Sequence, residues 1–207
     1  MPDRAADSWP ARLELGVAER PLRGERRSGD RAVLAAYDGG ALVAAIDGLG
    51  HGGEAADAAA IAADVLARHR GEDPLRLIEL CHRALARTRG VVMTVAWFDL
   101  QEKRLSWTGV GNVEGRLVRG AGRREPTEGA LTRGGVVGYN LPEVRVTATE
   151  LRDGDVIVLA TDGIDSGFAQ AISAGGPAQE IADRILAAHG KDSDDALVVV
   201  VRYLPAG

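Results

Sequence analysis

Apolar residues alternate with other residues along several short stretches of the chain, a pattern typical of half-buried strands. It predicts strands at 13–18, 31–37, 41–46, 91–100, 104–110, 114–119, 144–151, 156–161 and 196–203. Short turns such as Asp38-Gly39-Gly40 separate many of them, which indicates antiparallel hairpins. The segments 144–151 and 156–161 are expected to pair with each other around Asp153-Gly154.

The apolar period changes to helical spacing in three places, at 54–70, from Asp73-Pro74 to about residue 89, and at 177–189. Asp73-Pro74 is a helix start signal, an N-cap residue followed by proline in the first turn. Residues 120–135 have no period and are expected to form a loop. Two antiparallel sheets packed together, with helices on their outer faces, would bury every apolar stripe, so the fold class is α/β, or more strictly α+β.

The composition supports one globular domain over residues 11–207, preceded by a flexible tail at 1–10. Hydrophobic residues make up 45% of the 207 residues, and the net charge of −5 argues against nucleic acid as a partner. The chain shows neither an apolar run long enough to cross a bilayer nor a signal-peptide core, so we expect a cytoplasmic protein without membrane contact. The single cysteine, Cys81, is expected to be a buried and inert thiol.

Candidate chemistry lies in four acidic clusters at strand ends or in loops, namely Ser28-Gly29-Asp30, Asp47-Gly48, Asp162-Gly163 and Asp192-Ser193-Asp194-Asp195. An aspartate at the end of a strand is held rigidly, and a following glycine lets another group approach closely. Each Asp-Gly taken alone is as well explained as a turn. Together, carboxylates gathered at one sheet end would need a cation, and a set of oxygen ligands favours Mg²⁺ or Mn²⁺.

The order of these motifs resembles the metal-dependent protein phosphatases (PPM family), and most closely their bacterial SpoIIE/RsbX branch. The most specific piece is Asp47-Gly48-Leu49-Gly50-His51-Gly52 before a helix rich in small residues. Gly109-Val110-Gly111-Asn112, Thr161-Asp162-Gly163 and the Asp194-Asp195 pair before a valine run follow in the order of that branch. The resemblance covers nearly the whole chain and implies a four-layer α-β-β-α sandwich with a centre for two divalent cations, Mn²⁺ or Mg²⁺.

The resemblance also implies roles for individual residues. Asp47 would bridge the two cations, with the Gly48 carbonyl as a further ligand, while Asp162 and Asp194 would complete one site. Asp195 is left open as an alternative to Asp194, and Asp30 would hold metal-bound water at the side. His51 is a weak candidate for the general acid, because Leu49 fills the position where the large eukaryotic members have histidine.

The implied reaction is the hydrolysis of phosphoserine or phosphothreonine on a partner protein by a metal-activated water. The length resembles the stand-alone RsbX type, which implies a stressosome scaffold protein as substrate. We expect the enzyme to be a monomer. The alternatives are a phosphatase of a phosphorylated anti-sigma-factor antagonist, a hydrolase of small phosphoesters, and a binding module that has lost catalysis. Candidate substrate-binding residues are Arg26 and Arg27 before the first acidic motif and Arg123, Arg124 and Arg133 in the predicted loop, with Arg23 and Arg119 as further steering charges.

Overall fold

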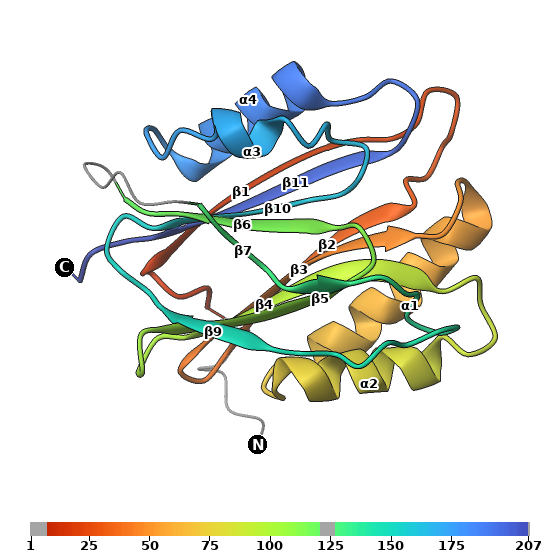
Figure 1. The fold of residues 1–207 in the computed structure, drawn as a ribbon, viewed down its shortest axis with the longest axis horizontal. Coiled ribbons are helices and arrows are strands. Elements are labelled where there is room, and N and C mark those ends of the chain that lie inside the picture. Colours follow the sequence, from red (N-terminus) through yellow and green to blue (C-terminus); the bar gives the residue numbers. More distant parts are fainter. Residues whose placement is uncertain (1–7, 121–126, 207) are drawn as a thin grey trace.

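The computed structural model describes residues 8–120 and 127–206 as two sheets packed face to face, with helices on both outer faces. Figure 1 shows the four layers, with α3 and α4 over one sheet and α1 and α2 over the other. This confirms the predicted fold class. The predicted tail lies partly outside the described residues, but Trp9 packs against the core and its indole nitrogen donates to the Leu13 carbonyl at 2.6 Å.

The first sheet contains five strands in the order β1-β11-β10-β6-β7, and all of its described pairings are antiparallel. The bounds are β1 Leu13–Arg20, β6 Glu114–Val118, β7 Glu128–Gly129, β10 Val156–Ala160 and β11 Ala196–Tyr203. Its outer face is covered by α4 (Ala178–His189) and the short α3 (Phe168–Ala171). The strands β10 and β11 are buried on both faces, which explains why they read as continuous apolar runs.

The second sheet contains six strands in the order β2-β3-β4-β5-β8, with β9 also paired to β5. The bounds are β2 Asp30–Tyr37, β3 Gly40–Gly48, β4 Val91–Asp99, β5 Arg104–Val110, β8 Thr132–Arg133 and β9 Thr147–Glu150. Its outer face is covered by α1 (Gly53–Arg68) and α2 (Pro74–Ala84), and the Asp73 side chain caps α2 as predicted. Cys81 lies fully buried on α2, and burial raises the pKa of its thiol to about 12, in line with an inert cysteine.

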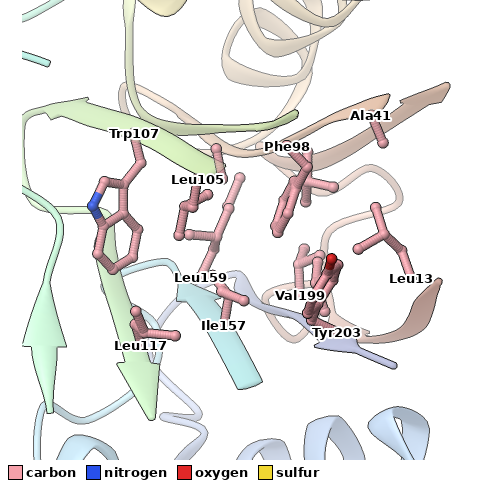
Figure 2. Packing of buried hydrophobic residues seen from close by; sticks show 14 of the residues in the cluster. Leu13, Ala41, Phe98, Leu105, Trp107, Leu117, Ile157, Leu159, Val199 and Tyr203 are labelled. Atoms are coloured by element: carbon pink, nitrogen blue, oxygen red, sulfur yellow. The ribbon is translucent and has the colours of Figure 1, made fainter. Parts of the chain in front are cut away.

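The main core lies between the two sheets. Figure 2 shows Phe98, Leu105 and Trp107 of the second sheet facing side chains of the first sheet, among them Ile157, Leu159 and Val199. Most of these side chains are completely buried. This core holds the ends of the strands at fixed positions, and the candidate site is built on those ends.

Three predictions of local structure were wrong. The second helix ends at Ala84 rather than near residue 89, because the chain turns at Leu85 and the Thr88 hydroxyl donates to the Leu85 carbonyl. The segment 120–135 is not only a loop, since β7 and β8 lie in its described part. The helix α3 was not predicted, because its single turn is too short to show a period.

The predicted pairing of 144–151 with 156–161 is also wrong. The strand β9 pairs with β5, while β10 pairs with β6 and β11, so the turn at Asp153-Gly154 carries the chain from one sheet to the other. This crossing is fixed by Asp155, which is fully buried and accepts hydrogen bonds from Arg119 at 2.7 Å and from the Arg152 amide at 2.9 Å. Arg119 is therefore a buried structural residue, and the prediction that it steers a partner from the surface was wrong.

Candidate metal centre

The acidic residues predicted from the sequence converge at one end of the two sheets. Asp30 and Asp47 are partners in the register of β2 and β3, so their side chains lie on the same face of neighbouring strands. Asp162 follows β10, and Asp194 precedes β11, which pairs with β10. The centre therefore joins residues from both sheets that lie up to 164 positions apart in the chain, counted from Asp30 to Asp194.

A cavity of about 620 Å³ opens at this point. It is lined by Asp47, Asp162 and Asp194 together with residues of neighbouring loops, namely Leu22, Leu49, Gly50, His51, Val92, Gly111, Asn112, Gly134, Gly135 and Ser193. Among the described residues, no three acidic, imidazole or thiol groups converge tightly enough to enclose an ion by themselves. Asp47, Asp162 and Asp194 instead surround an open space.

Burial and mutual repulsion disfavour the charged forms of these carboxylates. The pKa of Asp47 is raised to about 8, first by burial and then by the charges of Asp30, Asp162, Asp194 and Asp195. Burial also raises the pKa of Asp30 to about 7, although the hydrogen bond from Thr161 opposes the rise. The pKa of Asp194 is raised by burial, while the hydrogen bond from the Asp195 amide opposes the rise. A cluster with these properties fits a bound cation, which would supply the missing positive charge.

Asp30 lies behind the cavity rather than in its wall. It is buried, and its Oδ2 accepts a hydrogen bond from the Thr161 hydroxyl at 2.6 Å. The same hydroxyl accepts from the Leu197 amide at 2.9 Å, which fixes its proton toward Asp30. Thr161 thus connects the end of β2 to the end of β10 and holds the Asp30 carboxylate in one orientation.

The structure distinguishes Asp194 from Asp195. The two carboxylate oxygens of Asp195 accept from the amides of Leu22 and Gly29, at 2.7 and 2.8 Å, and its side chain is almost fully buried. Asp195 therefore binds the connector between β1 and β2. Asp194 lines the cavity and is the one of the pair that is placed to meet a ligand there.

Two glycines of the motifs are required by close packing. A Cβ on Gly48 would lie 2.2 Å from the carbonyl oxygen of Ala55, and one on Gly163 would lie 1.8 Å from that of Asp195. Gly48 lets α1 approach the end of β3, and Gly163 lets the Asp162 turn pack on the start of β11. Gly48 itself is buried and does not line the cavity.

Two residues that the sequence did not single out also contact Asp162. The Asn112 amide donates to Asp162 Oδ2 at 2.8 Å, and the Lys191 ammonium donates to the Asp162 carbonyl at 2.7 Å. Asn112 belongs to a recognised motif, but no role followed from its position in the sequence. Lys191 stands in a polar loop where nothing in the local pattern separates it from a solvated lysine.

The predicted substrate-binding residues are more scattered. His51 lines the cavity, with its side chain 68% exposed and its Nδ1 3.2 Å from Glu25 Oε1. Arg26 and Arg27 line a second cavity on the other side of Asp30, and Arg27 forms an ion pair with Asp57 at 2.8 Å. Arg133 is exposed on β8, next to Gly134 at the cavity wall. Arg123 and Arg124 lie outside the described residues.

Comparison with known proteins identifies the family. The family model described as Stage II sporulation protein E (SpoIIE) matches residues 37–204. No curated protein matches the chain. A structure solved for the bacterial stressosome, a modular system adapted to control secondary messenger signaling, is similar over 92% of this chain and 99% of its own, with 30% identity and a TM-score of 0.84.

Two more distant structures share the fold and contain divalent cations. RsbX in complex with magnesium is 20% identical, with a TM-score of 0.83 over 94% of this chain and 96% of its own. The catalytic domain of the serine/threonine protein phosphatase PstP, in complex with two manganese ions, is 21% identical, with a TM-score of 0.69 over 93% of this chain and 99% of its own. The chain belongs to the family described as Stage II sporulation protein E (SpoIIE).

Proposed function

We propose that this protein uses two divalent cations, Mg²⁺ or Mn²⁺, to hydrolyse phosphoserine or phosphothreonine on a scaffold protein of a bacterial stressosome. The observation that carries the proposal is the group of aspartates around one open cavity, in which burial and mutual repulsion raise the pKa of Asp47 and Asp30. Such a group is costly to keep ionised unless it binds cations.

Asp47, Asp162 and Asp194 would hold the cations, since their side chains line the cavity from three separate segments. Two bound cations would lower the pKa of a bound water to near neutral and would neutralise the phosphoryl oxygens during in-line attack. Asn112 fixes the orientation of the Asp162 carboxylate by its hydrogen bond. Asp195 acts indirectly, because it ties the connector that carries Leu22 and Gly29 to the start of β11.

His51 lines the cavity and is the candidate for the general acid. Its imidazole is exposed, and its Nδ1 lies 3.2 Å from Glu25 Oε1. If His51 is the general acid, its removal should slow the hydrolysis of esters with poor leaving groups more than the hydrolysis of an aryl phosphate.

The substrate class is proposed from the likeness to the stressosome structure, which is 30% identical to this chain. A phosphorylated anti-sigma-factor antagonist is a suitable comparison substrate, because it tests whether the enzyme recognises the partner protein or only the phosphorylated residue.

Metal dependence is the first test of the proposal. The purified protein should release phosphate from p-nitrophenyl phosphate in Mn²⁺ or Mg²⁺ and should lose at least about 90% of this rate, ~1.4 kcal/mol of barrier, in excess chelator. Addition of Mn²⁺ beyond the chelator should restore the rate. Full activity in the chelator would contradict a metal centre.

The second test separates substrates. A phosphorylated stressosome scaffold protein and a phosphorylated anti-sigma-factor antagonist are compared at equal concentration by the release of phosphate. A higher kcat/KM on the scaffold protein is expected, and a preference for the antagonist would overturn the stressosome assignment while leaving the chemistry intact.

A further inference from the structure

The two sheets of this protein have edge strands that differ in how their outer backbone groups are satisfied. In β1, the odd-numbered residues direct their amides and carbonyls away from β11. The Leu13 amide donates to the Pro10 carbonyl, and the Leu13 carbonyl accepts from Trp9. The Val17 amide and carbonyl are both bound by the Gln179 side chain, at 3.0 and 2.8 Å. The outer backbone groups of Leu13 and Val17 are therefore occupied within the protein, which restricts pairing of another strand at this edge.

The edge of β2 is open over its central part. The register with β3 and the bond from the Gly48 amide to the Gly29 carbonyl place the even-numbered residues of β2 outward. The Ala36 carbonyl is capped by Arg70 at 2.6 Å. Within the described part of the chain, the outer amides and carbonyls of Ala32 and Leu34 have no hydrogen-bond partner in the protein. These two residues offer two donors and two acceptors in a row.

The side chains at this edge add an apolar contact and positive charge. Leu34 is 40% exposed, among the largest exposures of an apolar side chain in the described residues. A cavity of about 350 Å³ adjoins Ala32 and is lined by three arginines, Arg26, Arg27 and Arg31, and by two acidic residues, Glu19 and Asp30. Arg27 is paired with Asp57, whereas Arg26 and Arg31 have no ion-pair partner among the residues that the structure describes. An acidic ligand would complement these two charges.

The edge also ends close to the candidate metal centre. Asp30, the first residue of β2, lines the arginine-lined cavity and contributes its charge to the aspartate group around Asp47. A segment bound along β2 would thus have one end at the arginine-lined cavity, separated from the aspartate-lined cavity by the buried Asp30. An open strand edge that ends next to an active site is suited to hold an extended part of the substrate, as in other cases of strand addition.

We propose that the free edge of β2 binds an extended, acidic segment of the phosphoprotein substrate as an added strand. Main-chain hydrogen bonds to Ala32 and Leu34 supply part of the affinity, and Arg26 and Arg31 select acidic side chains. This inference rests on the proposed phosphatase function for the identity of the partner, but the binding itself does not depend on turnover.

Amide hydrogen exchange tests the binding without activity. The probe is a synthetic peptide of alternating valine and glutamate with a phosphothreonine at one end, made in both orientations, and excess chelator keeps it intact. At least one orientation should slow exchange of the Ala32 and Leu34 amides severalfold. A control peptide with lysine in place of glutamate should leave both amides unchanged. Unchanged exchange with both acidic peptides would overturn the proposal.

Variants of Leu34 connect the edge to turnover. With metal present, Leu34→Glu should raise the KM for the acidic phosphopeptide severalfold by repulsion, and Leu34→Lys should not. Neither should change turnover of p-nitrophenyl phosphate. The matched control is Leu75→Glu on α2, because Leu75 has the same 40% exposure away from this edge. An equal effect of Leu75→Glu would contradict a role for the edge.

The outcomes separate the two proposals. Slowed exchange without phosphate release from any substrate would refute the phosphatase function and leave the edge as a peptide-binding site. Rapid hydrolysis of the phosphopeptide without slowed exchange would refute the edge and leave the function. If Leu34→Glu instead converts a dimer to a monomer in light scattering, the edge holds a second copy of the chain, and substrate binding there is refuted.

Discussion

Asp47 lies where burial and neighbouring carboxylates disfavour its charged form. It pairs with Asp30 across two neighbouring strands, and like charges directly opposite each other destabilise a sheet. Asp47→Asn removes that charge and keeps the shape. We expect phosphate release to fall more than tenfold, ~1.4 kcal/mol of barrier, while the thermal midpoint of the metal-free protein does not decrease. An activity above about a tenth of wild type would mean that Asp47 is structural.

Substitutions of the neighbouring residues Asp194 and Asp195 should have different effects on activity, metal binding and stability. Asp194→Asn should abolish metal-dependent activity and weaken metal binding in calorimetry, with little change in stability, because Asp194 lines the open cavity. Asp195→Asn removes the charge that binds the Leu22 and Gly29 amides, so we expect a loss of about 1–3 kcal/mol in the free energy of unfolding. If Asp195→Asn left stability unchanged but abolished metal binding, the two roles would have to be exchanged.

At the scale of elements, the position of α1 depends on a glycine at the end of β3. Gly48→Ala would place a Cβ 2.2 Å from the Ala55 carbonyl, so α1 must shift or the end of β3 must bend. We expect a destabilisation of about 1–3 kcal/mol in urea unfolding and a severalfold lower rate on p-nitrophenyl phosphate. Gly53→Ala is the matched control, since nothing lies within 4 Å of its Cβ position. Equal behaviour of the two variants would show that the contact is not restrictive.

The elements also explain where local patterns misled the prediction of strand pairing. Val156–Ala160 is apolar at every position because it lies at the centre of the first sheet, between β6 and β11. The preceding strand β9 lies at a sheet edge, half exposed, on β5 of the other sheet. A short turn normally indicates a hairpin, but the buried Arg119–Asp155 pair directs the chain across the sandwich instead. That pair links residues 36 positions apart, which no local window contains.

At the scale of the whole molecule, the aspartate group should couple stability to pH when metal is absent. The pKa of Asp47 is raised from 3.8 to about 8 in the folded protein. A carboxyl group with a raised folded pKa contributes stability fully below its unfolded pKa, and this contribution is lost as the pH rises through the folded value. The pKa of Asp30, raised to about 7, acts in the same direction.

We therefore expect the metal-free protein to melt at a higher temperature at pH 6 than at pH 8.5. Each kcal/mol lost from the free energy of unfolding should lower the melting temperature by roughly 2–4 °C. The measurement is thermal unfolding in excess chelator. Saturating Mg²⁺ should reduce the difference, because the cation stabilises the ionised carboxylates, and Asp47→Asn should reduce it in the metal-free protein. If the melting temperature of the metal-free protein did not change between these pH values, ionisation of Asp47 and Asp30 would not destabilise the fold as expected.

In the part of the chain that the structure describes, no helix is long and apolar enough to cross a membrane. The predicted monomeric state and cytoplasmic location stay predictions. The proposed binding of a substrate segment at β2 also belongs to this scale, because it depends on an edge strand of one sheet, the charged connector and the shared acidic centre.

The sequence by itself determined most of the elements and the identity of the acidic motifs. Periodicity reports local burial, and Asp-Gly after an apolar run reports a strand end, so both can be found within a few residues. The four-layer arrangement was predicted because each helix and sheet has an apolar face that must be covered. Asp30, Asp47, Asp162 and Asp194 were singled out from the sequence, and the structure brings them to one end of the two sheets.

Only the tertiary structure decided which carboxylate faces the cavity and which residues orient it. Asp194 and Asp195 are neighbours in sequence, and their roles differ because the connector at Leu22 and Gly29 packs against one of them. Asn112 reaches Asp162 only because two loops meet beyond the ends of β5 and β10. At the edge of β1, the outer backbone groups of Val17 are bound by Gln179, a residue 162 positions away in the chain. Contacts at such separations follow from the packing of whole sheets, which no local pattern records.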